Sequence, residues 1–542
     1  MKINQKRFTN NKTLREIGFD YVTGSLAVHS PQGNALLKSQ EPFLPGEESE
    51  LEKEYDRLEE MIAFVTREPK KANALMEALC ISKDISGSVK RSEAITLSVV
   101  ELFEIKAFLL LSEEIRRIVG EGSFELIPVG DALDVLDPKG DRINTFYVYD
   151  EFSEKLAKLR AEKKSLDSEI RVLQKEKKKL IKEKYGINLT PKFDIVIPKS
   201  SDDLEKARGI DLLEITGEDY SAVTFALKAD EETYKLTEKI ENLNMAIEEE
   251  EEACCVRLSR RIWEYAEIIL ENGKRIGYID LMMAKANFSR AHNLVRPKIM
   301  SEHILSINKG RHLQVEQILK SRGKDYCPIS MELSDGVTCI TGANMGGKTI
   351  SLKLAGLAKV MAQYGYFVPC ESMEVGLSSF MGMLIGDSQS VERGLSSFGS
   401  EMEELKDILQ NAKARSLILI DEIASGTNPL EGQALTESLV SYLVDKPYIS
   451  LITTHFDVID QRAVNMQVRG LADADFRKLN SELSGANRNE RIDIIGKYMD
   501  YSLKRVSAGS EVPKDALNIA SMLGLPEEII EGARNKLDKD NN

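Results

Sequence analysis

The chain has 542 residues, a net charge of −15 and 30% charged residues. This length predicts roughly three or four domains with a sizeable core. No apolar run reaches the roughly 18–20 residues of a membrane helix, and the polar N-terminal stretch lacks the apolar segment of a signal peptide. DNA affinity comes largely from basic residues that neutralise phosphates, so the acidic balance requires a local basic patch for any DNA-binding function.

The six cysteines have neither a CxxC pair nor metal-like spacing. This pattern favours reduced, mostly buried thiols. We therefore expect a cytoplasmic protein with no membrane partner.

Residues 1–150 have apolar residues at helical spacing and are predicted to form a mostly helical core domain. Two long helical segments follow, at 151–185 and 228–272. The insert between them, about 185–227, has the texture of short strands and turns. We expect an antiparallel coiled-coil arm over 151–272 with this insert as its tip.

The charges of the two arm segments are complementary. Glu154 to Lys184 contains 12 basic and 6 acidic residues, whereas Lys228 to Glu252 contains 3 basic and 10 acidic residues. An antiparallel hairpin would place 175–184 beside 230–232, and 160–164 beside 248–252. The lysine-rich run around 175–179 has two interpretations, a DNA patch or charge matching between the arm helices, and the second is favoured.

Residues 296–541 alternate between apolar strands and helices. Buried strands are predicted at 336–341, 416–421 and 449–455. Such runs separated by helices indicate a mostly parallel sheet covered on both faces.

The pattern G-x-x-x-x-G-K-[ST] is matched by Gly342, Gly347, Lys348 and Thr349. It lies between a predicted strand and a predicted helix, as a phosphate-binding P-loop requires. Backbone N–H groups and the helix N-terminus would bind the phosphates of ATP. Lys348 would neutralise the β- and γ-phosphates, and the Thr349 hydroxyl would ligate Mg²⁺.

Three further elements follow in the order of an ABC-type nucleotide site. The strand 416–421 ends in two carboxylates, of which Asp421 would hold the Mg²⁺ shell and Glu422 would act as general base. His455, at the end of the next predicted strand, would sense the γ-phosphate. The small-residue turn 394–402 precedes a helix and could bind phosphate. Alone, an acidic strand end or a single histidine is more often structural, and the shared order favours function.

These residues resemble those of MutS-type ATPases, the ABC-like family of DNA mismatch repair. The chain's TGANMGGKT differs by Ala343 from the family's TGPNMGGK core. GLSSFGSEM resembles its signature loop, LILIDEIASGT its Walker B and D-loop, and TTHF its histidine switch. The resemblance covers about 275–455 and 515–535, and is architectural over 1–274.

The resemblance implies further nucleotide contacts and a dimer, either a homodimer or a heterodimer with a related subunit. In that dimer Ser396 and Ser397 of one subunit would complete the site of the other. Tyr326 falls where the family places an aromatic on adenine. The implied loop contacts are Asn344, Met345, Gly346 and Ile350.

The implied architecture is multidomain, with all-α core and lever helices, a coiled-coil clamp and a C-terminal α/β P-loop ATPase domain of ABC type. We expect a helical core at 1–150, the arm at 151–272, a lever or connector helix at 273–300 and the ATPase domain at 301–542. The chain departs from the family in having Leu313 in its GRHL motif and a long polar segment at 456–512. We expect a short form without the mismatch-recognition and Smr domains.

Two functions fit this pattern. In the first, ATP binding closes a dimeric clamp on DNA, in mismatch repair or recombination. In the second, the same ATPase acts as a chaperone-like reactivating factor on a protein client such as a cobalamin-dependent aminomutase. The tip at 185–227 contains 4 basic and 8 acidic residues, and an acidic tip is poorly suited to DNA contact.

Overall fold

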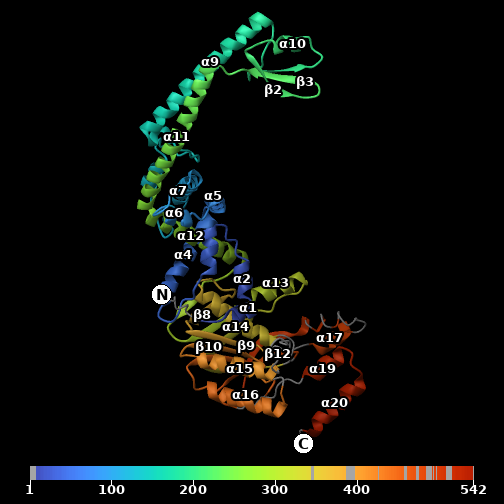
Figure 1. Cartoon of the computed structure of the whole chain (residues 1–542). Helices are drawn as coiled ribbons and strands as arrows, with labels where there is room; N and C mark the ends of the chain where they lie inside the picture. Colours follow the sequence, from blue (N-terminus) through green and yellow to red (C-terminus); the bar gives the residue numbers. More distant parts are fainter. Residues whose placement is uncertain are drawn as a thin grey trace. The chain divides into compact units, whose positions relative to one another are not determined.

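The computed structural model describes residues 8–342, 347–385, 397–424, 427–456, 460–471, 475–483, 491, 494–495, 497–507 and 515–540. Figure 1 shows the helices and strands along the chain. The chain divides into two compact units, and each is described by itself. The arm unit comprises residues 30–32 and 77–276, and the large unit comprises residues 1–29, 33–76 and 277–542. The domain boundaries expected at 150, 272 and 300 stay predictions.

The arm unit is mostly helical, and local signals set where its helices begin. The Ser98 side chain accepts a hydrogen bond from the N–H of Glu101, and the Glu101 carboxylate accepts one from the N–H of Ser98. This capping box begins α7. Ser153 caps α9, and Gly186, in the left-handed region with φ of 71°, ends it. The helices within this unit are α6 (Ser86–Arg91), α7 (Val99–Val119), α8 (Gly130–Leu136), the 3-10 turn η1 (Asp150–Phe152), α9 (Glu154–Tyr185), α10 (Asp203–Arg208) and α11 (Glu231–Glu264).

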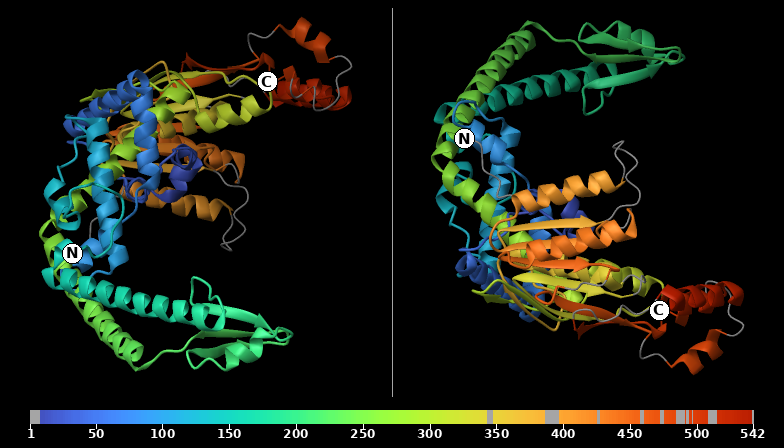
Figure 2. Two further views of the ribbon diagram at one scale, coloured as in Figure 1. Left: turned by 90° about the horizontal axis from the view of Figure 1, so that it is seen from above. Right: turned by 90° about the horizontal axis from the view of Figure 1, so that it is seen from below.

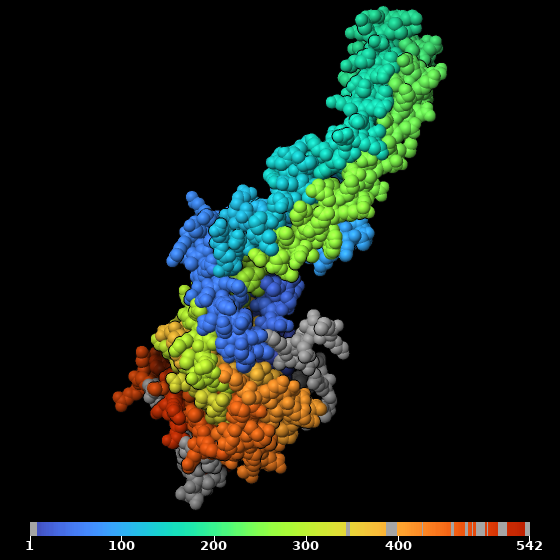
Figure 3. Space-filling view, turned by 90° about the vertical axis from the view of Figure 1, so that its left-hand side faces the viewer, coloured from blue at the N-terminus to red at the C-terminus, as the bar shows by residue number. Residues whose placement is uncertain are grey.

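Helices α9 and α11 form the predicted antiparallel pair and lie side by side in Figure 3. Lys177 Nζ lies 2.7 Å from the Asp230 carboxylate near one end of the pair. Arg160 lies 2.6 Å from Glu251 near the other end. The charge matching expected from the sequence is confirmed at these two positions.

The tip between α9 and α11, where the sequence predicted short strands and turns, forms a small sheet of three antiparallel strands. Its order is β1-β3-β2, with β1 at Asp194–Pro198, β2 at Leu213–Glu218 and β3 at Ala222–Leu227. Val223 and Phe225 of β3 are buried together with Ile181 from α9. This apolar core fastens the tip to the end of α9.

The helix expected over 228–272 ends earlier than predicted. It breaks at Tyr265, whose N–H donates to Ile262 O at 3.0 Å, one residue short of the helical partner. The next helix, α12, runs from Ala266 to His292. No Gly or Pro marks this break, so helical periodicity continued through it. The connector expected at 273–300 is correspondingly the end of α12 followed by strand β4 (Lys298–Met300).

The large unit is built on a six-stranded sheet in the order β13-β12-β7-β11-β10-β9. The strand pairs are parallel except β12 with β13, which confirms the predicted mostly parallel sheet. The strands are β7 (Gly336–Thr341), β9 (Phe380–Ile385), β10 (Ser416–Asp421), β11 (Tyr448–Thr453), β12 (Val464–Gly470) and β13 (Asp500–Val506).

Helices cover both faces of this sheet. Helices α15 (Ser397–Asn411) and α16 (Pro429–Leu443), orange in Figures 1 and 2, lie on one face. Ile408 of α15 and Val440 of α16 pack there against Ile418 and Ile420 of β10. Helix α14 (Gly347–Gln363) lies on the other face, where Gly356 allows close approach to Leu419. Alternate residues of one strand therefore serve opposite faces.

A second sheet of four strands was not predicted from the sequence. Its order is β4-β8-β5-β6, and β5 is antiparallel to both neighbours. Its other strands are β5 (Ile304–Gly310), β6 (Ile329–Ser334) and β8 (Ser372–Gly376). Burial alternates along β6, as expected for a sheet with one covered face.

The remaining helices lie near the chain ends or between strands. Leu313 occupies the first position of α13, which proline also favours. Among the helices of the described residues, none has the length and apolar character needed to cross a bilayer. The helices whose bounds have not yet been given are α1 (Asn11–Glu16), α2 (Phe19–Gly24), α3 (Pro31–Lys38), α4 (Glu48–Arg67), α5 (Pro69–Ile81), α13 (Leu313–Ser321), α17 (Phe476–Leu483), α19 (Asp515–Met522) and α20 (Glu527–Asp540).

Side chains from α4 and α12 hold the C-terminal end of α14. The Tyr55 hydroxyl donates to Ala362 O at 2.8 Å. The buried Lys285 ammonium donates to Tyr364 O at 3.0 Å and lies 4.2 Å from the ring centre of Tyr366. Burial lowers the pKa of Lys285 to about 8. Helix α14 is thus tied at this end to α4 and to the part of α12 that belongs to the same unit.

Candidate nucleotide site

The segment predicted to bind phosphate joins β7 to α14. Gly342 has φ of 132°, a conformation that favours glycine, and a Cβ there would lie 3.2 Å from Val468 Cβ. Lys348, Thr349 and Ile350 lie in the first turn of α14, after Gly347. The other predicted loop contacts lie outside the described residues, namely Asn344, Met345 and Gly346.

Thr349 and Asp421 come together from α14 and β10, as their predicted roles require. The Thr349 hydroxyl donates to Asp421 Oδ2 at 2.8 Å. The Thr453 hydroxyl, at the end of β11, donates to the other carboxylate oxygen. A hydroxyl beside a carboxylate is an all-oxygen donor set of the kind that Mg²⁺ prefers, so these residues fit the ion. Within the described ranges no group of three or more His, Cys, Asp and Glu gathers as a metal site.

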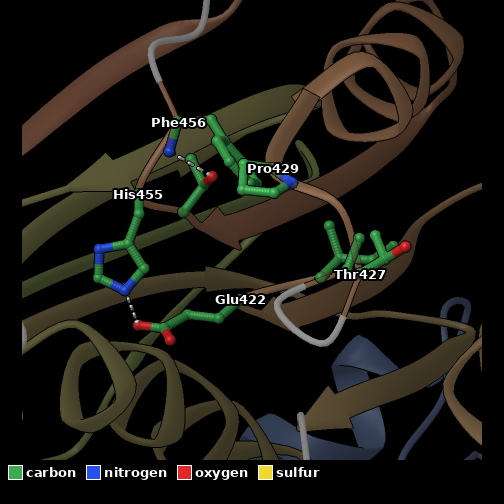
Figure 4. A pocket seen from close by; sticks show the side chains of 8 residues that line it. Glu422, Thr427, Pro429, His455 and Phe456 are labelled. Atoms are coloured by element: carbon green, nitrogen blue, oxygen red, sulfur yellow. Dashed lines mark hydrogen bonds and ion pairs between the residues drawn. The ribbon is translucent and has the colours of Figure 1, made fainter. Parts of the chain in front are cut away.

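Lys348, Glu422 and His455 form a compact cluster beside this pair. Lys348 Nζ lies 3.0 and 3.1 Å from the two ring nitrogens of His455 and 3.2 Å from Glu422 Oε1. His455 Nε2 lies 2.8 Å from the same carboxylate oxygen, as Figure 4 shows. The hydrogen bond from His455 and the nearby Lys348 charge lower the pKa of Glu422 to about 2. Burial lowers the pKa of Lys348.

The turn after β10 is conformationally strained. Glu422 and Ala424 both have positive φ, 50° and 61°, which costs roughly 1–2 kcal/mol for a residue with a side chain. The N–H of Glu422 donates to Thr453 O at 3.0 Å. Such strain persists where the surroundings over-determine the conformation, and it occurs often at functional sites.

A small pocket adjoins this turn, and its lining includes the side chains labelled in Figure 4. Ala424 and Thr427 of the predicted D-loop line it together with Pro429 and Phe456. The intervening Ser425 and Gly426 lie outside the described residues. The pocket therefore opens directly beside Glu422 and His455.

Two predicted contacts are not placed with this cluster. Tyr326 has a buried hydroxyl, and burial raises its pKa to about 12. Ser397 begins α15, whereas Ser396 lies outside the described residues. Their predicted roles in binding adenine and the partner's nucleotide stay predictions.

Two contacts near the site were not predicted from the sequence, although one of them involves Glu401 of the segment 394–402 that resembles the signature loop. Tyr501 of β13 lies at 3.0 Å from where a Cβ on Gly347 would be, yet it belongs to the polar segment 456–512. Glu401 of α15 accepts from the Ala424 N–H at 2.9 Å. An acidic residue on an amphipathic helix is ordinarily solvent-exposed, so only the fold reveals this contact.

A lysine and a threonine at the start of a helix, facing acidic residues at the end of a neighbouring parallel strand, define a nucleotide-binding ATPase domain. Ligands of open α/β sheets bind beside the carboxyl ends of the strands, where this cluster lies. The class of nucleotide-binding ATPase domain is therefore indicated by the site and the sheet together.

Comparison with known proteins shows what the chain is similar to. Residues 338–540 match MutS domain V. The chain is 31% identical over 312 residues to Endonuclease MutS2 of Fusobacterium nucleatum, which covers 56% of the chain and 36% of the relative. It is 27% identical over 482 residues to Endonuclease MutS2 of Lactiplantibacillus plantarum, and the match covers 86% of the chain and 56% of the relative. It is 30% identical over 312 residues to DNA mismatch repair protein MutS of Salinibacter ruber, and the match covers 56% of the chain and 32% of the relative.

Residues 338–540 are thus similar to the ATPase domain of MutS-family proteins. The chain spans between about a third and little more than half of the length of these relatives. The match with the second relative extends well beyond the ATPase domain, over most of the chain.

Proposed function

We propose that the chain hydrolyses ATP and uses the cycle to close and open a dimeric clamp on DNA. The observation that carries the proposal is the convergence of Lys348, Thr349, Asp421, Glu422 and His455 at one edge of the sheet. Each of these side chains has a chemical task in ATP hydrolysis. We place this activity in the cytoplasm.

In the proposed reaction, a water oxygen attacks the γ-phosphorus and the bond to the ADP oxygen breaks. Glu422 orients this water and accepts its proton. Lys348 neutralises charge on the β- and γ-phosphates, and His455 reads the γ-phosphate. A γ-phosphate would draw the Lys348 ammonium away from Glu422. Because that ammonium and His455 hold the Glu422 pKa at about 2, its departure would raise the pKa and make Glu422 a better base.

Mg²⁺ supplies charge neutralisation on the phosphate oxygens when it is bound. Thr349 and Asp421 would hold it, and Thr453 orients the Asp421 carboxylate by its hydrogen bond. Gly342 and Gly347, with the loop residues between them, would supply N–H groups to the phosphates.

The proposed dimer follows from the family resemblance. In it, Ser396 and Ser397 of one subunit meet the nucleotide of the other, and Tyr326 contacts adenine. ATP then favours the closed form by its difference in affinity for the two states. The helices α9 and α11, with their tip, act as the moving clamp.

DNA is the proposed client because the relatives are named for endonuclease and mismatch repair functions. These names give no support to the alternative of a protein client. The acidic tip argues that DNA contact lies elsewhere on the chain than on residues 185–227.

A binding titration tests the client. Homoduplex, mismatched and branched DNA are titrated at low salt, with ATP, against wild-type protein and Lys348→Ala. We expect micromolar or tighter binding that weakens as salt rises, since phosphate contacts release counterions. If micromolar protein with ATP binds none of these substrates, the DNA proposal is wrong and a protein client takes its place.

A further inference from the structure

Glu401, which lies within the segment 394–402 that resembles the signature loop, connects α15 to the turn that carries Glu422. It lies in the first turns of α15, which begins at Ser397. Its carboxylate accepts from the Ala424 N–H at 2.9 Å. This bond joins two chain segments of the large unit that the sequence separates by more than twenty residues.

The Ala424 end of this contact is a conformation that needs support. Ala424 has φ of 61°, and Glu422, two residues earlier, has φ of 50°. Ile423 between them is buried, so the turn cannot rotate without losing apolar packing. A hydrogen bond to the Ala424 N–H therefore helps to fix the backbone that aims Glu422.

A charged side chain at position 401 is not needed for packing alone. The side chain is half-buried, burial raises its pKa, and the described residues place no cation within 4 Å of it. A neutral amide would accept the same hydrogen bond at a lower desolvation cost. Burying a carboxylate here costs desolvation free energy, which a purely structural role would not require. As a charged acceptor, the carboxylate makes a strong hydrogen bond that can hold the strained turn.

A second glutamate of α15 contacts another helix. Lys12 of α1 donates to both carboxylate oxygens of Glu404, at 2.7 and 2.8 Å. Glu401 thus gives α15 a hydrogen bond to the turn, beside the apolar packing of Leu405 near Ile423. Glu404, in contrast, links α15 to α1.

We infer that Glu401 is a positioning residue that sets the orientation of Glu422 according to the position of α15. A displacement at the start of α15 then changes hydrolysis within the same chain. This inference rests on the proposed function, in which residues 396–397 meet the partner's nucleotide. It supplies a route by which ATP in one site controls the base of the other.

The test compares Glu401→Ala and Glu401→Gln in the full chain. Steady-state ATP hydrolysis gives kcat and KM, and equilibrium binding of a fluorescent ATP analogue gives the affinity. We expect Glu401→Ala to lower kcat at least 10-fold with KM and affinity within about 3-fold, because the nucleotide contacts remain. The amide oxygen of Glu401→Gln keeps the acceptor, so kcat should stay within about 3-fold of wild type.

Glu403→Ala is the matched control, since Glu403 is exposed on the same helix, and its kcat should equal that of wild type. If Glu401→Ala does not fold, Glu401→Asp replaces it, because its shorter side chain withdraws the carboxylate. The inference is overturned if kcat is unchanged in the variant that removes the contact, or if Glu401→Gln is as impaired as Glu401→Ala. If instead wild-type protein and Lys348→Ala hydrolyse ATP equally, the proposed function itself has failed.

Discussion

The arm and the nucleotide site use charge in opposite ways. In the arm, Lys177 and Arg160 meet carboxylates at the helix surface, and the Asp230 side chain is 49% exposed. At the nucleotide site, the Lys348 side chain is 4% exposed and faces Glu422 and His455 together. Solvent weakens the arm pairs, whereas burial strengthens the interactions of the cluster. The arm charges therefore align two helices, and the site charges are placed to act on phosphate.

The largest effect should come from removing the site cation. Lys348→Ala is expected to abolish ATP binding or turnover, because no other side chain of the cluster carries an obligate positive charge. Phosphate release measured at saturating ATP checks this expectation. Turnover at the wild-type rate would contradict the assignment of the phosphate loop.

A second test concerns a buried charge outside the cluster. The folded chain lowers the pKa of Lys285 from 10.5 to about 8, so the unfolded chain binds more protons between these values. Stability should therefore rise with pH over this window, by about 2 kcal/mol between pH 7.5 and 9.5. The free energy of unfolding is measured in urea at each pH for wild type and for Lys285→Met. The difference between the two proteins isolates the pH dependence that comes from Lys285.

Lys406→Met serves as the control for Lys285→Met, since Lys406 is exposed in the same unit. Its difference from wild type measures the effect of replacing an exposed lysine by methionine over the same pH range. An equal slope for both variants would show that the Lys285 ammonium is not desolvated.

The smallest effect should come from the arm. Arg160→Ala removes the contacts with Glu251 and Asp150 and should destabilise the helix pair by about 1 kcal/mol or less. High salt should reduce the difference further. Thermal unfolding at low and high salt measures it, and a large loss independent of salt would show that this pair is not solvent-screened.

The sequence predicted the elements whose signals are local. The spacing from Gly342 to Thr349 and the acidic end of β10 located the cluster, and complementary charge predicted the Lys177–Asp230 pair. The break at Tyr265 was missed because no residue there opposes a helix. The four-stranded sheet was missed because its short strands are distant in sequence.

The contacts that position the site residues could not be predicted, for a different reason. Glu401 and Tyr501 become site neighbours only when α15 and β13 are folded against other segments. Tyr501 belongs to no predicted motif, and Glu401 lies in the segment that resembles the signature loop, where the resemblance gave it no role. Tertiary placement, rather than pattern, gives them their roles.

The central claim is that Glu422 performs the chemistry while other residues bind the nucleotide. The most direct measurement compares ATP affinity and single-turnover hydrolysis in wild type and Glu422→Ala. The account predicts an affinity within about 3-fold of wild type and hydrolysis slower by about 10²–10⁴-fold, the loss typical of a positioned base. Hydrolysis by Glu422→Ala at the wild-type rate would contradict it.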